Sequence, residues 1–255
     1  MKYDIKLKNE HDIELLRESG KRLSRVLQAV AAEVRPGVTT SYLNDFVYKM
    51  ITDMGDKPAF LNYKPFGAKY PYPGSICISV NDEVVHGIGN DRVLEEGDIV
   101  GLDGGVTHKG MISDSAITVP VGKVSKEDED LMRVTKEALM AGIKAAKAGN
   151  YVNDISKAIE KAVPKKYGVV KILSGHGVGY KVHEEPYVPN FDDGVKGPKL
   201  VPGLVLAIEP MVNLGTDEVY LADDGYTFIT KDHKKSAHFE HSILITEQGL
   251  EILTM

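Results

Sequence analysis

Residues 96–103 read Glu-Gly-Asp-Ile-Val-Gly-Leu-Asp, and residues 202–209 read Pro-Gly-Leu-Val-Leu-Ala-Ile-Glu. In each stretch a glycine precedes a short apolar run, and an acidic residue follows at the same offset, Asp103 in one and Glu209 in the other. Short apolar runs between turn residues are typical of buried strands. The two stretches therefore indicate two related strands, each of which brings one carboxylate to the same region of the fold.

Two further pairs of segments match in the same order along the chain. Residues 114–117 (Asp-Ser-Ala-Ile) resemble 240–243 (Glu-His-Ser-Ile), and 43–46 (Leu-Asn-Asp-Phe) resemble 152–155 (Val-Asn-Asp-Ile). Chance explains one such match, but three in the same order favour an internal repeat. We therefore predict one catalytic domain over residues 1–255, of mixed α/β (α+β) class with a central antiparallel sheet. Its two α/β halves, about 1–122 and 123–255, are expected to be related by a pseudo-twofold axis.

Apolar spacing and turn residues predict the elements of each half. The first half is expected to hold one helix from Ile13 to Val34 and a second after residues 39–41, followed by an extended loop over the Pro-, Gly- and Tyr-rich residues 55–74. The second half is expected to hold helices at 125–149 and 152–163. Strands are predicted at 76–80, 99–103, 117–121, 169–173, 204–209, 227–230 and 242–246.

The composition excludes several classes of protein. A hydrophobic content of 42% is ordinary for a globular chain, and a net charge of −6 argues against a broad nucleic-acid surface. Cys77 is the only cysteine, so an intramolecular disulfide is impossible and a reducing compartment is expected. No signal peptide and no run of ~18 apolar residues is seen. We expect a cytoplasmic protein with no membrane segment and no specific nucleic-acid partner.

Four carboxylates and one imidazole stand at the ends of apolar runs or in glycine-flanked loops. In a shared dry pocket these carboxylates would repel one another unless cations lay between them, and two divalent ions would neutralise four of them. A donor set dominated by oxygen favours Mn, Fe, Co or Zn over a structural zinc site. Two such ions activate water for hydrolysis. The residues are Asp103, Asp114, His176, Glu209 and Glu240.

The local sequence around these residues supports the prediction unevenly. Asp103 and Asp114 are separated by Gly104-Gly105 and Gly110, a pattern for two antiparallel strands joined by a turn. Taken alone, each aspartate is more often a turn residue or a surface charge, and His176 is as readily a loop histidine between glycines. His238 and His241, which stand beside Glu240, are left out of the predicted ligand set.

The motifs in this order resemble those of type I methionine aminopeptidases over nearly the whole chain. Glu209 and Glu240 are 31 positions apart, too close for the helical insertion that the type II members of that family carry. The segments that carry the resemblance are residues 75–81 through 85–87, 174–179 with 183–186, 208–211 and 239–242.

The resemblance implies the pita-bread fold and a metallo-aminopeptidase (a hydrolase and metalloprotease) that excises the initiator methionine of nascent polypeptides with a small second residue. It implies two divalent ions, Co, Mn, Fe or Zn, bound by the five residues above, with Asp114 and Glu240 bridging and a bridging water as nucleophile. Glu209 would be the general base, and His183 would stabilise the oxyanion. The substrate would be bound by His86, His183, Cys77, Tyr72 and Tyr226.

Three alternatives remain open. An X-Pro peptidase of the same fold shares the metal ligands, but such enzymes usually have a large domain before the first ligand, and Asp103 leaves no room for one. A catalytically dead binding module would lack ligands that are present here. Basic side chains at residues 161–171 and 231–235 are expected to be solvated, with a ribosome contact as the alternative. A monomer is the default expectation.

Overall fold

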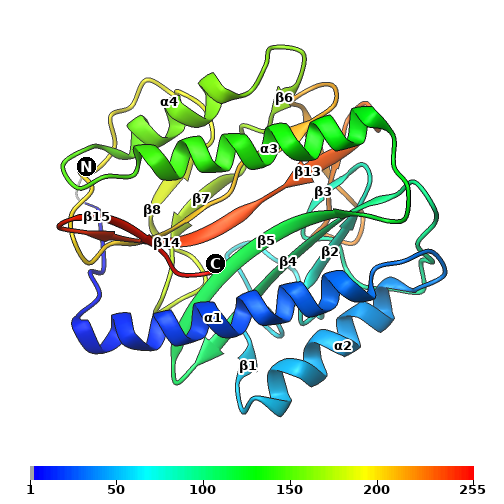
Figure 1. Ribbon diagram of the computed structural model, residues 1–255, viewed down its shortest axis with the longest axis horizontal. Helices are drawn as coiled ribbons and strands as arrows, with labels where there is room; N and C mark the ends of the chain where they lie inside the picture. Colours follow the sequence, from blue (N-terminus) through cyan, green and yellow to red (C-terminus); the bar gives the residue numbers. More distant parts are fainter. Residues whose placement is uncertain (1–2) are drawn as a thin grey trace.

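The computed structural model describes residues 3–255. Two pairs of helices pack against a large central sheet (Figure 1). The first helix begins with a capping box in which Asn9 and Asp12 exchange side-chain and backbone hydrogen bonds. The third helix begins with the same motif, formed by Ser125 and Asp128. The helices are α1 (Glu10–Glu33), α2 (Thr40–Asp53), α3 (Lys126–Ala145) and α4 (Val152–Ala162).

The central sheet has nine strands, and all of its pairings are antiparallel, which confirms the predicted fold class. The main path runs β1-β4-β5-β14-β9-β7-β8, with β2 paired to β4 and β15 paired to β14. The strands are β1 (Lys57–Pro58), β2 (Cys77–Val80), β4 (Ile99–His108), β5 (Met111–Pro120), β7 (Ser174–Gly177), β8 (Glu184–Pro189), β9 (Val205–Ile208), β14 (Glu240–Thr246) and β15 (Gly249–Ile252).

The described residues also form two three-stranded sheets. One has the order β13-β10-β6 and the other the order β11-β12-β3. Their strands are β3 (Glu83–Val85), β6 (Gly168–Val169), β10 (Met211–Asn213), β11 (Val219–Leu221), β12 (Phe228–Thr230) and β13 (Ser236–His238).

The strands follow one another in a similar way on the two sides of the β5–β14 contact, and the division into halves 1–122 and 123–255 stays a prediction. Reading outward from the β5–β14 contact, β5, β4 and β2 follow on one side, and β14, β9 and β7 follow on the other. The two stretches that suggested a repeat lie in equivalent places, since residues 99–103 belong to β4 and residues 205–208 form β9.

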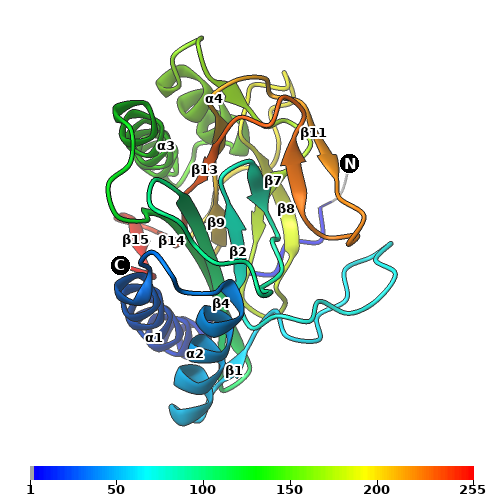
Figure 2. The ribbon, with the colours of Figure 1, turned by 90° about the vertical axis from the view of Figure 1, so that its right-hand side faces the viewer.

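The helices lie against one face of the sheet. Figure 2 shows α1 and α3 on the same side of the strands. Apolar residues of α1 and α2 pack with Ile78 and Leu102, while those of α3 and α4 pack with Leu206 and Ile208. Because side chains alternate along a strand, residues next to these in sequence point to the opposite face. Asp103 and Glu209 are such neighbours.

Several local predictions need correction. Asp103 does not end its strand, because β4 continues to His108 and pairs with β5 along its whole length. Residues 169–173 do not form one strand: pairing ends at Val169, and the next strand is the glycine-containing β7. Eight strands were not predicted, and all of them except β8 are only two to four residues long: β1, β3, β7, β8, β10, β11, β13 and β15. Residues 55–74 form a loop apart from β1, as expected.

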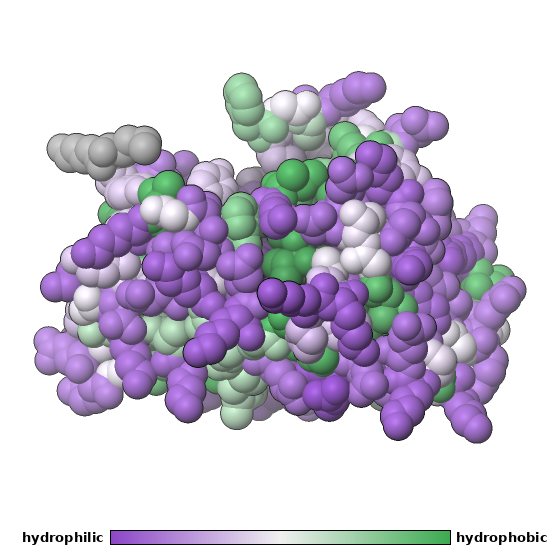
Figure 3. Space-filling view, turned by 90° about the horizontal axis from the view of Figure 1, so that it is seen from above, coloured by the Kyte–Doolittle hydropathy of each residue, from purple (hydrophilic) through white to green (hydrophobic). Residues whose placement is uncertain are grey.

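The surface agrees with the charged composition. The face in Figure 3 is mostly hydrophilic, with apolar residues confined to limited patches. Within residues 3–255 the helices are too short or too polar to cross a membrane.

Candidate metal centre

Neighbouring strands of the central sheet bring the five predicted ligands together. Asp103 lies in β4, Asp114 in β5, Glu240 in β14 and His176 in β7, and Glu209 directly follows β9. These strands are consecutive in the sheet, and all five side chains line one cavity. The register explains the convergence. Asp103 and Glu240 lie opposite Ala116 from its two sides, and Asp114 is two positions before Ala116 and so points to the same face.

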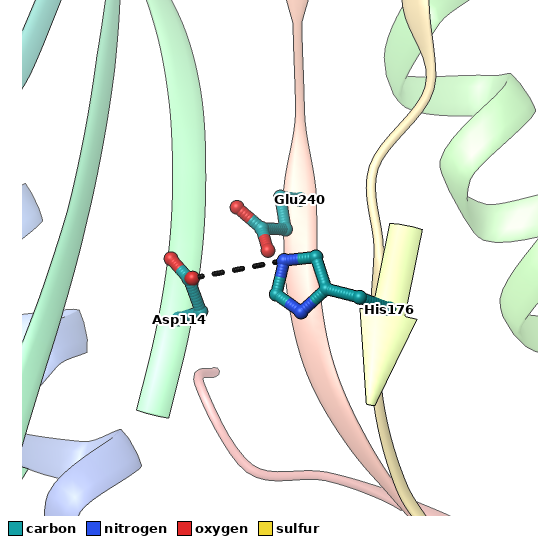
Figure 4. A group of neighbouring side chains, drawn as sticks. All are labelled: Asp114, His176 and Glu240. Carbon is teal, nitrogen blue, oxygen red and sulfur yellow. Dashed lines mark ion pairs between the residues drawn. The ribbon is translucent and has the colours of Figure 1, made fainter. Parts of the chain in front are cut away.

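Asp114, His176 and Glu240 form the tightest group (Figure 4). One possible ligand atom from each lies within 4.8 Å of the others. His176 Nε2 is 4.0 Å from Asp114 Oδ2 and 3.3 Å from Glu209 Oε1. The Nδ1 atom of His176 lies 2.9 Å from the carbonyl oxygen of Gly177, which leaves Nε2 directed at the carboxylates. Asp103 lines the same cavity but is not part of this three-residue group.

Burial makes the carboxylates of the centre hard to ionise when no cation is bound. Burial raises the pKa of Asp103 to about 7, and the neighbouring Glu209 charge adds to the rise. The pKa values of Asp114, Glu209 and Glu240 are also raised well above their usual range, in each case chiefly by burial. Burial lowers the pKa of His176 to about 3, so its imidazole is neutral and free to coordinate near pH 7.

The unpartnered atoms of the centre fit a bound cation. Asp103 Oδ1, Asp114 Oδ1 and Glu240 Oε1 are buried and have no hydrogen-bond partner among the described residues. Such atoms are costly unless something outside the protein chain satisfies them. Carboxylate oxygens with one neutral imidazole are suitable donors for divalent ions of the Mn, Fe, Co and Zn group. The residues present therefore fit a divalent metal centre.

His238, which is outside the predicted ligand set, lies next to the centre. Its Nε2 atom is buried, has no hydrogen-bond partner among residues 3–255, and lies 3.5 Å from Glu209 Oε2. The signal was present in the sequence, because His238 and Glu240 are two positions apart and extended chain places such residues on one face. His241 instead lies 2.9 Å from Thr254 Oγ1, away from the carboxylates.

An apolar compartment adjoins the carboxylates within the same cavity, which has a volume of about 260 Å³. The predicted wall residues Cys77, Tyr72 and Tyr226 all line it. The rings of Tyr72 and Tyr226 meet edge to face, with centroids 5.2 Å apart. Burial raises the pKa of the Cys77 thiol well above its usual range, so this sulfur is a wall atom and not a nucleophile. Val182 is buried in the same apolar cluster.

His183 and His86 both line the cavity. The His183 ring lies edge-on to His176, with centroids 4.5 Å apart, and its Nδ1 atom is 3.0 Å from the hydroxyl of Tyr63. This contact with Tyr63 could not be predicted from the sequence, because it spans 120 positions. His86 has a left-handed backbone with φ of 61°. Burial lowers the pKa of His86 to about 4 and also lowers that of His183.

Residues 14–247 match the sequence pattern of metallopeptidase family M24. The chain belongs to this family. Its M24 relatives include "Methionine aminopeptidase" of Aquifex aeolicus, 47% identical over 98% of both chains. "Methionine aminopeptidase" of Clostridium perfringens is 45% identical over 98% of this chain and 99% of the relative.

Solved structures of M24 proteins confirm the fold. Methionine aminopeptidase from Rickettsia prowazekii superposes with a TM-score of 0.94 at 38% identity, covering 98% of this chain and all of that chain. Prolidase from Pyrococcus furiosus has a TM-score of 0.75 at 22% identity. The superposition covers 98% of this chain and 65% of the prolidase chain. The pita-bread fold is thus shared with both, and the methionine aminopeptidases are the nearer of the two groups.

Proposed function

We propose that this M24 metallopeptidase is an aminopeptidase that removes the initiator methionine from nascent polypeptides whose second residue is small. The observation that carries the proposal is the junction of two compartments in one cavity, a buried carboxylate–imidazole centre and an aromatic-walled apolar pocket. The near full-length identity to methionine aminopeptidases supports the same substrate class. An X-Pro specificity has only a more distant fold relationship in its favour.

The proposed cofactor is a pair of divalent ions, drawn from Co, Mn, Fe or Zn. Asp114 and Glu240, which lie in the tight three-residue group with His176, would be central to holding them. When bound, such ions lower the pKa of water in the site and stabilise negative charge on a tetrahedral oxygen. The residues proposed to hold them are Asp103, Asp114, His176, Glu209 and Glu240.

The other steps are assigned to side chains of the cavity. Glu209, with its raised pKa, is the proposed general base, which takes a proton from the attacking water and passes it to the leaving amine. His183 is neutral near pH 7; when Tyr63 donates to Nδ1, the Nε2–H group of His183 is available to the developing oxyanion. His86, also neutral, is proposed to contact the substrate near the scissile bond.

The apolar compartment is proposed to bind the methionine side chain. Tyr72 is fixed by its hydroxyl, which donates to the Gly87 carbonyl oxygen at 2.7 Å, so its ring faces the pocket in one orientation. Tyr226 and Cys77 form the adjoining walls. A thioether gains roughly 0.3–1.5 kcal/mol from contact with an aromatic ring, which favours methionine over an aliphatic side chain of similar size.

Metal-free protein resupplied with single metals provides the test of this function. We expect hydrolysis of Met-Ala-Ser with at least one of Co, Mn, Fe or Zn, and little hydrolysis of a Xaa-Pro peptide under the same conditions. Faster cleavage of the Xaa-Pro peptide would overturn the methionine assignment. Failure to bind any of these ions under non-oxidising conditions would instead indicate an inactive binding protein.

Replacement of His183 by alanine is expected to lower kcat for Met-Ala-Ser by roughly 10²–10³-fold, the usual effect of removing one donor to an oxyanion. The bound-metal content should stay at the wild-type value, because His183 is not in the carboxylate group. Steady-state kinetics and metal analysis on the same preparation measure both. His233→Ala is the control, since His233 is exposed, pairs with Asp82, and neither residue lines the cavity. A loss of metal that accompanies the loss of kcat would assign His183 to the metal centre.

The proposed partner is the N-terminus of a nascent polypeptide in the cytoplasm, and the proposed oligomeric state is a monomer. The basic residues give little support to a ribosome contact. Lys171 pairs with Asp217 at 2.6 Å, Lys231 pairs with Glu218 at 2.9 Å, and Lys235 pairs with Asp128 at 3.0 Å. These lysines are engaged within the chain, which favours an ordinary solvated surface.

A further inference from the structure

A buried lysine lies where the segment before α1 crosses the edge of the central sheet. This segment, dark blue in Figure 1, leads past the edge strand β8 into the first helix. The backbone N–H of Lys8 donates to the Gly203 carbonyl oxygen at 2.8 Å, which fixes the crossing. The Lys8 side chain is only 1% exposed, an unusual state for a lysine.

The partner of Lys8 is Glu184, the first residue of β8. Lys8 Nζ donates to Glu184 Oε2 at 2.5 Å, and the Glu184 side chain is 5% exposed. Lys8 Nζ also donates to the Lys6 carbonyl oxygen at 3.0 Å and lies 4.7 Å from the centroid of the Tyr180 ring. A buried ion pair of this kind stabilises little by itself, but an unpaired buried charge is strongly unfavourable. Each partner therefore depends on the other to stay in place.

The second carboxylate oxygen of Glu184 closes the loop that joins β7 to β8. Glu184 Oε1 accepts from the backbone N–H groups of Tyr180, at 2.5 Å, and Lys181, at 2.9 Å. Gly179 packs directly on the lysine stem, because a Cβ atom at this position would lie 2.4 Å from Lys8 Cε. The loop is thus held by hydrogen bonds to Glu184 and by the packing of Gly179 against Lys8.

This loop ends at His183, the residue immediately before Glu184. We propose that Lys8 is a positioning residue, which through Glu184 holds the 178–183 loop in the conformation that directs His183 into the cavity. The inference rests on the proposed function, in which His183 donates to the oxyanion. Lys8 touches neither substrate nor metal in this account; it acts on catalysis only through the loop.

Two features separate this role from general stabilisation. The contact of Tyr63 with His183 holds one ring nitrogen but does not restrain the backbone on which the ring is carried. The backbone restraint comes from the Glu184 carboxylate, whose orientation depends on Lys8. Burial lowers the pKa of Lys8, while the hydrogen bond that Lys8 donates to Glu184 opposes that change, as expected for a charge retained only because of its partner.

The test compares Lys8→Met, Glu184→Gln and the double variant with the wild-type protein, all in full-length, metal-loaded form. Lys8→Met is expected to lower kcat for Met-Ala-Ser at least tenfold, with KM within twofold and the metal content unchanged. The double variant, which leaves no unpaired buried charge, should recover part of that loss. Lys6→Met is the matched control on the same segment, because Lys6 pairs with Asp4 in an exposed contact, and it should leave kcat unchanged.

Nuclear magnetic resonance of the histidine rings supplies a readout that global stability does not change. In folded Lys8→Met, well below its melting temperature, the His183 ring signals should shift or broaden while the His86 signals stay in place. A lower melting temperature with unchanged kcat and unchanged His183 signals would overturn the proposal. If Lys8→Met does not fold, Glu184→Gln decides alone, since it keeps an acceptor for the two backbone N–H groups. An inactive wild-type protein would refute the proposed function, whereas the His183 signals would still test the positioning.

Discussion

Asp103→Asn is expected to abolish measurable turnover of Met-Ala-Ser, with a loss of at least ~10²–10³-fold, the range for removing one preorganised charge from a site. The substitution removes an anionic ligand but keeps the size and shape of the side chain. Asp103 lies in the middle of β4, where it is held on both sides by the β2 and β5 pairings, so the amide will occupy the same place. Activity assays and metal analysis of the purified variant give the two measurements.

The fold of the Asp103→Asn variant should be retained. Burial raises the pKa of Asp103 to about 7, which shows that its ionised form is unfavourable in the protein without metal. A neutral amide avoids this penalty and lessens the repulsion that raises the pKa of Asp114. We therefore expect a melting temperature for the metal-free variant at or above that of the metal-free wild-type protein.

Asp53→Asn is the matched control for this experiment. Asp53 forms an exposed ion pair with Lys49 at 2.6 Å at the end of α2, and exposed pairs contribute about 0–1 kcal/mol. Its activity and metal content should equal those of the wild type. Wild-type turnover in Asp103→Asn would show that Asp103 is not an essential metal ligand. The proposed centre would then rest on Asp114, His176 and Glu240.

The five proposed ligands could be picked out from the sequence because the relevant signals are local, and the structure brings them to one cavity; that they bind metal stays a prediction. A carboxylate next to an apolar strand needs a reason to be there, and Asp103, Asp114, Glu209 and Glu240 share that feature. The repeated order of the segments then indicates that they meet. The proximity of His238 to Glu209 could not be predicted, although its spacing from Glu240 places both on one face, because a histidine in a strand has several ordinary explanations and this contact is not local.

The strand boundaries were harder to predict than the strands themselves. β4 continues through Gly104-Gly105 because its neighbour β5 supplies hydrogen bonds along ten residues, a tertiary effect that no local propensity contains. β7 forms from a glycine-rich segment for a related reason: a Cβ at Gly175 or Gly177 would collide with the backbone of a neighbouring strand. Glycine there permits close strand pairing instead of marking a loop, which the sequence alone does not distinguish.

The link between Lys8 and Glu184 shows a second limit of sequence reasoning. The two residues are 176 positions apart, and Lys8 stands among other lysines at the start of the chain. A lysine in such a segment is ordinarily exposed, and only the packing of Gly179 and Gly203 around it shows that this one is buried. Such a contact depends on tertiary packing between segments that are distant in the sequence.

Removal of the divalent metal is expected to abolish turnover and to make the stability of the protein fall as pH rises from about 4 to 8. In the metal-free protein the pKa of Asp103 is raised to about 7, and those of Asp114, Glu209 and Glu240 are raised as well. Unfolded carboxyl groups titrate near pH 4, so between these values the folded chain binds more protons than the unfolded chain. The stabilising contribution of the protonated groups is complete below pH ~4 and is lost as pH rises through 7.

Added metal should reverse this loss, because cations take the place of the protons. A metal at 100 times its dissociation constant stabilises the folded state by about 2.7 kcal/mol, which for a chain of this size raises the melting temperature by about 5–10 °C. At pH 5.5 protons compete for the same carboxylates, so the shift should be smaller than at pH 8. Calorimetric melting of metal-free protein with and without Mn²⁺ at both pH values measures the difference. Two outcomes would contradict this prediction: an equal shift at the two pH values, or a metal-free stability that does not change between pH 5 and 8. Either would mean that the four carboxylates do not form one coupled metal centre, because a cation bound to all of them must displace the protons that they carry in its absence.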